Sequence, residues 1–102
     1  MSTLHTVNKS PFERNNLEAC LGHAQPGDAI LLIEDGVIAA LAGGSLEGKM
    51  ADAAKTFKLF ALGPDLAARG LDPARIVAGI KVVDYGGFVD LTAENKAINA
   101  WL

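Results

Sequence analysis

The sequence has few of the features that mark secreted or membrane-spanning proteins. It contains one cysteine and therefore cannot form an internal disulfide bond, which suits a reducing compartment. No apolar run approaches the ~18 residues that cross a bilayer. The N-terminus lacks the basic segment followed by an apolar segment that forms a secretory signal. We therefore expect a soluble, cytoplasmic protein.

Positive charge is also scarce. Nine Lys and Arg residues against 12 Asp and Glu residues give a formal net charge of −3, which disfavours direct binding to nucleic acid. The phosphate-binding patterns GxxxxGK[ST] and GxGxxG are absent, which argues against nucleotide binding. A phosphoacceptor receiver domain needs acids after its first strand, where this chain has Val7, Asn8 and Lys9. No His, Cys and acid cluster has metal-ligand spacing, so we expect no cofactor and no metal.

Apolar residues, in contrast, are abundant. They make up 50% of the chain, and the mean hydropathy of +0.25 is high for a small soluble monomer. A chain of 102 residues can fold around one core, so we expect a single domain over residues 1–102. Part of the apolar content is expected to face a partner subunit.

The stretch from Gly27 to Ala42 contains two apolar runs separated by three residues. The first, Ala29 to Ile33, is unbroken and is typical of a short strand that is covered on both faces, as in a parallel sheet. The second, Val37 to Ala42, is expected to form a helix with Asp35 as its N-cap. Because a strand with two apolar faces needs cover on both sides, the fold should be a layered α/β structure.

The rest of the chain continues this alternation. Further strands are expected at Ser2 to Val7, Phe57 to Leu62, Ile80 to Val83 and Ala97 to Leu102. Helices are expected from the capping box at Ser10 to Glu13, over Asp65 to Arg69 and over Tyr85 to Glu94, whereas Met50 to Ala54 can form a short helical turn. The pattern predicts a single α/β sheet of four or five mostly parallel strands with helices on both faces.

Cys20 is the one reactive side chain, and it lies on the first expected helix. Leu17, Leu21 and Ala24 form an apolar stripe, and Cys20 lies about 50° from its centre, at the rim of the buried face. His23 could hydrogen-bond the thiol or, when protonated, favour the thiolate. A position past the middle of the helix disfavours an anion. Two interpretations stand, a packed and inert cysteine or a chemically used one.

The other candidates have structural interpretations. His5 is expected to be a half-buried side chain with its hydrogen bonds satisfied. Asp84 and Tyr85 are expected to cap the last helix and pack, rather than to act as acid and base. Trp101 lies either in the core or at an interface, and its place on a short edge strand favours the interface.

Four segments together resemble the DsrH/TusB family, and the match covers essentially the whole chain. They are LHTVNKSPF at Leu4 to Phe12, GDAILLIEDGVIAAL at Gly27 to Leu41, FALGPDLAARGL at Phe60 to Leu71 and VDYGGFVDLT at Val83 to Thr92, and the terminal Ala100-Trp101 also fits. The resemblance implies a flavodoxin-like fold and a place as the smallest subunit of a heterohexamer with two copies each of three related chains. One such complex, TusBCD, relays persulfide sulfur toward 2-thiouridine at the tRNA wobble position. The other, DsrEFH, serves cytoplasmic sulfur oxidation.

Cys20 bears on the choice between these branches. The principal sulfur-carrying cysteine of the family belongs to the DsrE/TusD subunit. TusB-like chains commonly lack a cysteine at the position of Cys20, whereas DsrH-like chains carry one on the first helix. The resemblance therefore implies sulfur oxidation, with Cys20 as an accessory persulfide acceptor, DsrE-like and DsrF-like partner subunits and a DsrC-like sulfur acceptor. The alternatives are a non-catalytic structural subunit and a TusB-like role in tRNA thiolation, and whether the chain counts as an enzyme stays open.

Overall fold

The computed structural model describes residues 2–102, and its centre is one five-stranded parallel sheet. The spatial order of the strands is β4-β3-β2-β1-β5, and all four pairings are parallel. The strands are β1 (Thr3–Val7), β2 (Ala29–Leu32), β3 (Lys58–Leu62), β4 (Ile80–Val83) and β5 (Ala97–Trp101). The predicted parallel α/β sheet is confirmed.

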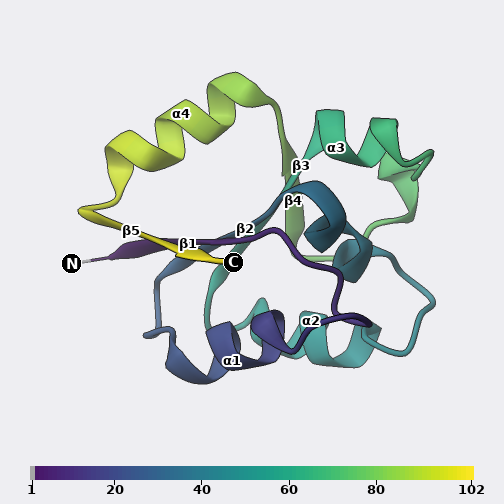
Figure 1. Ribbon diagram of the computed structural model, residues 1–102, viewed down its shortest axis with the longest axis horizontal. Helices are drawn as coiled ribbons and strands as arrows, with labels where there is room; N and C mark the ends of the chain where they lie inside the picture. The colour runs from purple at the N-terminus through teal and green to yellow at the C-terminus, as the bar shows by residue number, and fades with distance from the viewer. Residues whose placement is uncertain (1) are drawn as a thin grey trace.

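The helices cover both faces of this sheet, as predicted. They are α1 (Asn16–His23), the 3₁₀ helix η1 (Glu34–Ala40), α2 (Glu47–Ala53), α3 (Gly63–Ala68), the 3₁₀ turn η2 (Pro73–Arg75) and α4 (Tyr85–Glu94). In Figure 1 the sheet is seen nearly edge-on, with α1 and α2 below it and α4 above it. None of the helices within residues 2–102 is long and apolar enough to cross a membrane.

Strand β2 lies in the middle of the sheet and separates two apolar cores. All four of its residues are buried. Ile30 and Leu32 belong to the larger core, together with buried residues of α1 and α2. Ala29 and Leu31 face the other way and pack with Leu91 of α4. The unbroken apolar run in the sequence follows from this position, because both faces of a central parallel strand are covered.

The direction in which the strands are added reverses beside β1. The chain places β2, β3 and β4 successively on one side of β1, and then returns through α4 to place β5 on the other side. In the parallel register of β1 and β5, His5 pairs with Asn99 and Val7 pairs with Trp101. The first and last strands are therefore neighbours, and side chains from the two ends of the chain meet on one face of the sheet.

The expectation that the first helix begins at the capping box of Ser10 is wrong. The Ser10 hydroxyl accepts the N–H of Phe12 at 3.2 Å, and the Ser10 carbonyl accepts the N–H groups of Glu13 and Arg14, both at 3.1 Å. These bonds close a turn, but α1 begins only at Asn16. Residues 12–15 are exposed, so the segment lacks the packed apolar face from which most helical stability in proteins comes.

Asp35 does not cap the helix that follows β2, which corrects a second expectation. This helix is the 3₁₀ helix η1, and its N-cap Ile33 makes no side-chain capping bond. The Asp35 carboxylate instead accepts a hydrogen bond from Nε of Arg69 at 2.9 Å. Arg69, the C-cap residue of α3, thus forms an ion pair with Asp35, which was expected to be an N-cap.

The remaining boundaries agree more closely. Strand β4 and helix α4 have the predicted bounds, and the Asp84 side chain caps α4 by accepting the N–H of Gly87 at 2.8 Å. Tyr85 is 61% exposed and so does not pack as expected. The helix predicted over residues 65–69 is α3 and begins two residues earlier, with Pro64 in its first turn.

Candidate functional site

Cys20 lies in the core of the protein. It is fully buried on α1, and it belongs to the larger core cluster together with Leu17. Burial raises the pKa of the Cys20 thiol to about 12, and the nearby negative charge of Asp28 acts in the same direction. The thiolate, which is the nucleophile in sulfur transfer, is therefore strongly disfavoured in this chain by itself.

The expectation that Cys20 lies at the rim of the buried face is wrong, because the side chain is fully buried. Leu17 and Cys20 are the buried residues of α1, whereas Leu21 and Ala24 are only partly buried. The helix is therefore rotated about its axis so that Cys20 points into the core. Trp101 packs against the same cluster from β5.

A buried polar network lies on the same face of the sheet as α1. His5 on β1 is 2% exposed, and Asp28, just before β2, is 4% exposed. Nε2 of His5 lies 2.9 Å from Oδ2 of Asp28. On the other side of the ring, the indole Nε1 of Trp101 donates to Nδ1 of His5 at 3.1 Å. The expectation that His5 has satisfied hydrogen bonds is confirmed, although the ring is buried rather than half-buried.

These contacts determine the tautomer of His5. An indole N–H can only donate, so Nδ1 of His5 must accept and the ring proton lies on Nε2. Nε2–H then donates to the Asp28 carboxylate. Since both ring nitrogens have partners inside the protein, the neutral ring has no free nitrogen with which to act as a base on a substrate.

Asp28 is held as a carboxylate by its own hydrogen bonds. Its burial raises the pKa, but the N–H of Gln25 at 3.0 Å, the His5 ring and the N–H of Thr3 at 3.0 Å all bond the charged form. The hydrogen bonds outweigh the desolvation, so the pKa of Asp28 lies below its usual value. The carboxylate thereby connects β1, the start of β2 and the loop after α1.

His23 also approaches this network, which the spacing of residues in the sequence did not predict. Its ring lies edge-on to His5, with centroids 6.4 Å apart, and edge-on to Trp101, with centroids 5.7 Å apart. These contacts are aromatic packing. Within the described residues 2–102, no three His, Cys, Asp or Glu side chains are arranged to hold a metal ion.

At the carboxyl edge of the sheet, where ligands of parallel α/β folds commonly bind, the acidic residues hold loops together. The Asp65 side chain accepts the backbone N–H of Glu34 at 2.6 Å. Arg69 contacts Asp35 through Nε and its terminal nitrogen, each at 2.9 Å. Glu34 has a left-handed backbone, with φ of 50°, which the bond from Asp65 helps to hold. These side chains join the loop after β2 to α3.

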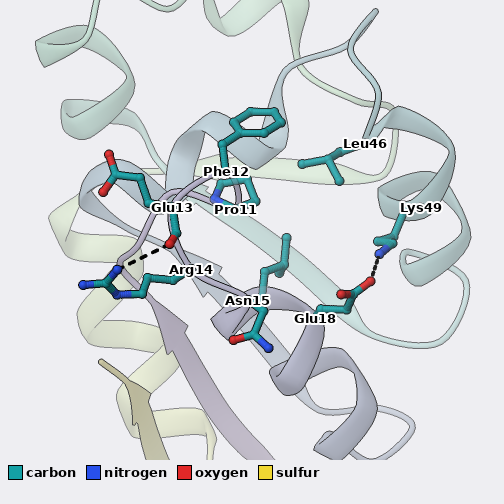
Figure 2. Close-up of a pocket in the computed structure, with 9 residues that line it drawn as sticks. Pro11, Phe12, Glu13, Arg14, Asn15, Glu18, Leu46 and Lys49 are labelled. Atoms are coloured by element: carbon teal, nitrogen blue, oxygen red, sulfur yellow. Dashed lines mark hydrogen bonds and ion pairs between the residues drawn. The ribbon is translucent and has the colours of Figure 1, made fainter.

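A pocket of about 340 Å³ opens beside the loop that follows β1. Figure 2 shows its lining residues, with the ion pair of Glu18 and Lys49 joining α1 to α2. Phe12 contributes an aromatic ring that is 70% exposed. Neither Cys20 nor His5 lines this pocket, so the hollow and the buried polar network are separate features.

Comparison with known proteins identifies the family. A family model described as "DsrH like protein" matches residues 9–98. The chain belongs to the DsrH family. Among curated relatives of this DsrH-family chain, Protein TusB of Pectobacterium parmentieri is 40% identical over 98 residues, covering 96% of this chain and 99% of that protein. Protein TusB of Escherichia coli O1:K1 is 39% identical over the same shares of the two chains. The predicted membership is confirmed.

Two solved structures share the fold of this DsrH-family chain. The ychN protein from E. coli aligns with a TM-score of 0.78 at 14% identity, covering 98% of this chain and 99% of that one. MTH1491 from Methanobacterium thermoautotrophicum, a protein of unknown function, aligns with a TM-score of 0.75 at 16% identity, covering 97% of both chains. At these identities the likeness concerns the fold alone.

Sequence reasoning identified Cys20 and His5 but missed the partners of His5. Asp28 has no predicted role, and Trp101 is predicted only to lie in the core or at an interface. A signal was present: if β5 is placed beside β1 in parallel register, an aromatic residue at position 101 lies near a histidine at position 5. That inference needs the strand order, which the local pattern of residues does not contain.

Proposed function

We propose that this chain is a subunit of a sulfur-relay complex of the TusBCD and DsrEFH kind. The observation that carries the proposal is its similarity to TusB proteins over nearly the full length of both chains. The chain consists of one domain over residues 1–102 and works in the cytoplasm. Its contribution is to complete the complex.

The favoured destination of the sulfur is 2-thiouridine at the tRNA wobble position. Curated relatives from three Pectobacterium species are TusB proteins, and they are 40–41% identical to this chain. Sulfur oxidation, the function expected from Cys20, is the second candidate. Its support rests on the presence of a cysteine on α1. A thiol that accepts sulfur must be accessible to the donor and must ionise to the thiolate, and the burial of Cys20 opposes both.

We further propose that Cys20 packs the core and that a cysteine of a partner subunit carries the persulfide. A persulfide on Cys20 would add a sulfur atom where the side chain is already fully buried. Closely packed cores accept additional atoms poorly. The expected role of Cys20 as an accessory acceptor is the alternative, and it requires that assembly or motion of α1 expose the thiol.

The surface supports a heteromeric assembly. Within residues 2–102, the large apolar side chains that are more than half exposed are Phe12, Tyr85, Val89, Ile98 and Leu102. Two of them lie on α4 and one lies on β5, which is an edge strand with unpaired backbone groups on its outer side. Scattered apolar residues are normal on a surface, but an edge strand with little charge favours cover by a partner. DsrE-like and DsrF-like chains are the proposed partners, with a DsrC-like protein as sulfur acceptor.

Complementation in a bacterium that lacks its own TusB tests this function. We expect the wild-type chain to restore 2-thiouridine in tRNA and to co-purify with the TusC and TusD subunits of the host. The Cys20→Ala variant should restore the same level, since it keeps a small apolar side chain in the core. Co-purification without restored 2-thiouridine would contradict the tRNA destination. Assembly with DsrE and DsrF in place of TusC and TusD would favour sulfur oxidation.

A further inference from the structure

The buried ring of His5 is the titratable group that the proposed function leaves unused. It lies between a permanent hydrogen-bond donor, the indole N–H of Trp101, and a carboxylate, that of Asp28. Each nitrogen of the ring therefore has one fixed role, Nδ1 as acceptor and Nε2 as donor. Only the neutral ring satisfies both roles at once.

Protonation of this ring changes one contact and keeps the other. The added proton occupies Nδ1, which then becomes a donor facing the N–H of Trp101. Two donors cannot share a hydrogen bond, so the 3.1 Å contact must break. On the other side Nε2–H still donates to Asp28, now as a buried ion pair, so the charged ring is compensated without leaving the core.

The hydrogen bond of Trp101 to His5 lies at the C-terminal end of β5, beside β1. Trp101 is the final residue of β5 and pairs with Val7 in the parallel ladder with β1. It is partly buried against the larger core, and its ring meets those of His5 and His23. Since β5 has a neighbour on one side only, this side chain is its main polar attachment beyond the backbone ladder.

We propose that Trp101, His5 and Asp28 form an acid-sensitive latch, in which neutral His5 holds the C-terminal end of β5 against β1 and protonated His5 releases it. The release leaves the ladder of β5 in place at its start, where the N–H of Lys96 bonds the carbonyl of Ser2. Opening therefore frees the indole and the last residues of the strand. The proposal stands on the geometry of this chain and does not depend on the proposed function.

The polar and titratable groups near His5 lie on β5, on α1 and just before β2. Asp28 precedes β2 and attracts the proton, whereas Trp101 on β5 opposes it through its N–H. On α1, His23 lies edge-on at 6.4 Å, and the Cys20 thiol stays neutral. Among residues 2–102, Asp28 is the one ion-pair partner of His5. Asp28 and Trp101 are thus the groups that contact the two ring nitrogens of His5.

The experiment is a pH titration of the full chain by NMR and fluorescence, from about pH 8 to about pH 5, across the range where histidines ordinarily protonate. Trp101 is the sole tryptophan of the sequence, so its indole N–H resonance and its emission report on this site alone. We expect the indole resonance to move in one transition together with the His5 ring. Protection of the last β5 amides should fall about tenfold for each pH unit as the pH drops toward this transition, as for opening that binds one proton.

Two variants assign the transition. His23→Gln should keep it, because His23 makes only ring contacts with Trp101. Asp28→Asn should move it to lower pH, since the attraction for the proton is lost. Protonation of His5 with an unchanged indole resonance would overturn the proposal. So would a transition that disappears in His23→Gln, a ring that stays neutral across the range, or loss of all structure at once without earlier opening of β5. The wild-type titration needs no variant and decides the question if a variant does not fold.

Discussion

The indole Nε1 of Trp101 donates to Nδ1 of His5 over 3.1 Å, joining residues that are 96 positions apart in the sequence. This bond adds a side-chain contact to the backbone ladder that pairs the last strand with the first. It also fixes His5 as the Nε2–H tautomer, in which Nε2 donates to the Asp28 carboxylate. The contact between Trp101 and His5 thus depends on β5 lying beside β1, and it sets the tautomer of the buried His5.

Replacement of Trp101 by Phe should destabilise the protein at neutral pH by about 1–3 kcal/mol, because Nδ1 of His5 is left buried without a partner. The variant keeps an aromatic ring, so most of the packing is preserved. Urea unfolding measures the change. Val89→Ala is the control, because Val89 is 65% exposed and its truncation should change stability by less than about 0.5 kcal/mol. A Phe variant as stable as the wild type would show that the bond contributes nothing.

The sequence predicted the strands well because each is an apolar run with a physical reason. The run from Ala29 is unbroken since β2 is buried on both faces. The start of the first helix was predicted wrongly because the turn at Ser10 satisfies the same backbone bonds as a helical cap. Only tertiary packing decides between the two, and exposed Phe12 shows that the packing is absent there.

Only part of the candidate site was predicted, because local sequence patterns do not contain the tertiary packing around it. Cys20 and His5 are recognisable as isolated chemical groups. Their environment depends on how far α1 rotates and on which strand lies beside β1, and both are properties of the assembled fold. The partners Asp28 and Trp101, and the burial of the thiol, therefore follow from the structure and not from local spacing.

Asp28→Asn should weaken the dependence of stability on acid. The pKa of Asp28 is lowered in the folded chain, so the folded state keeps the carboxylate where the unfolded chain already binds a proton. This contribution is complete above the usual pKa of 3.8 and is lost as pH falls through the folded value. The variant should lose about 1–3 kcal/mol at pH 7, and its stability should fall less steeply below pH 3.8. Equal acid slopes in urea unfolding would contradict the assignment.

The Cys20 thiol should react slowly with a thiol reagent in the folded chain. With a pKa of about 12, the thiol at pH 8 lies about four units below its midpoint, so about one molecule in ten thousand carries the thiolate. An unfolded cysteine has a pKa of about 8.5 and is ionised to a substantial fraction at that pH. We expect the folded rate to be at least about a hundredfold lower than the rate in denaturant. Cys20→Ser is the blank, and equal rates would show that the thiol is accessible.

Gly36→Ala should prevent folding or destabilise the protein by more than about 3 kcal/mol. A Cβ at this buried position would collide with the carbonyl oxygen of Val7, which accepts the N–H of Ile33 at 3.0 Å. Gly48→Ala is the matched control: in α2 an added Cβ meets nothing within 4 Å, so it should stabilise the helix by roughly 0.5–1 kcal/mol. Circular dichroism during urea unfolding compares the two. Tolerance of alanine at position 36 would contradict the packing of η1 on β1.

The central claim is that this chain completes a sulfur-relay complex without carrying the sulfur itself. Intact-mass spectrometry of the assembled complex after exposure to polysulfide tests it most directly, with the Cys20→Ala complex measured alongside. The account predicts that this chain gains no sulfur in either complex while a partner subunit does. A gain of one or more sulfur atoms on the wild-type chain, absent in Cys20→Ala, would contradict it and make Cys20 a carrier.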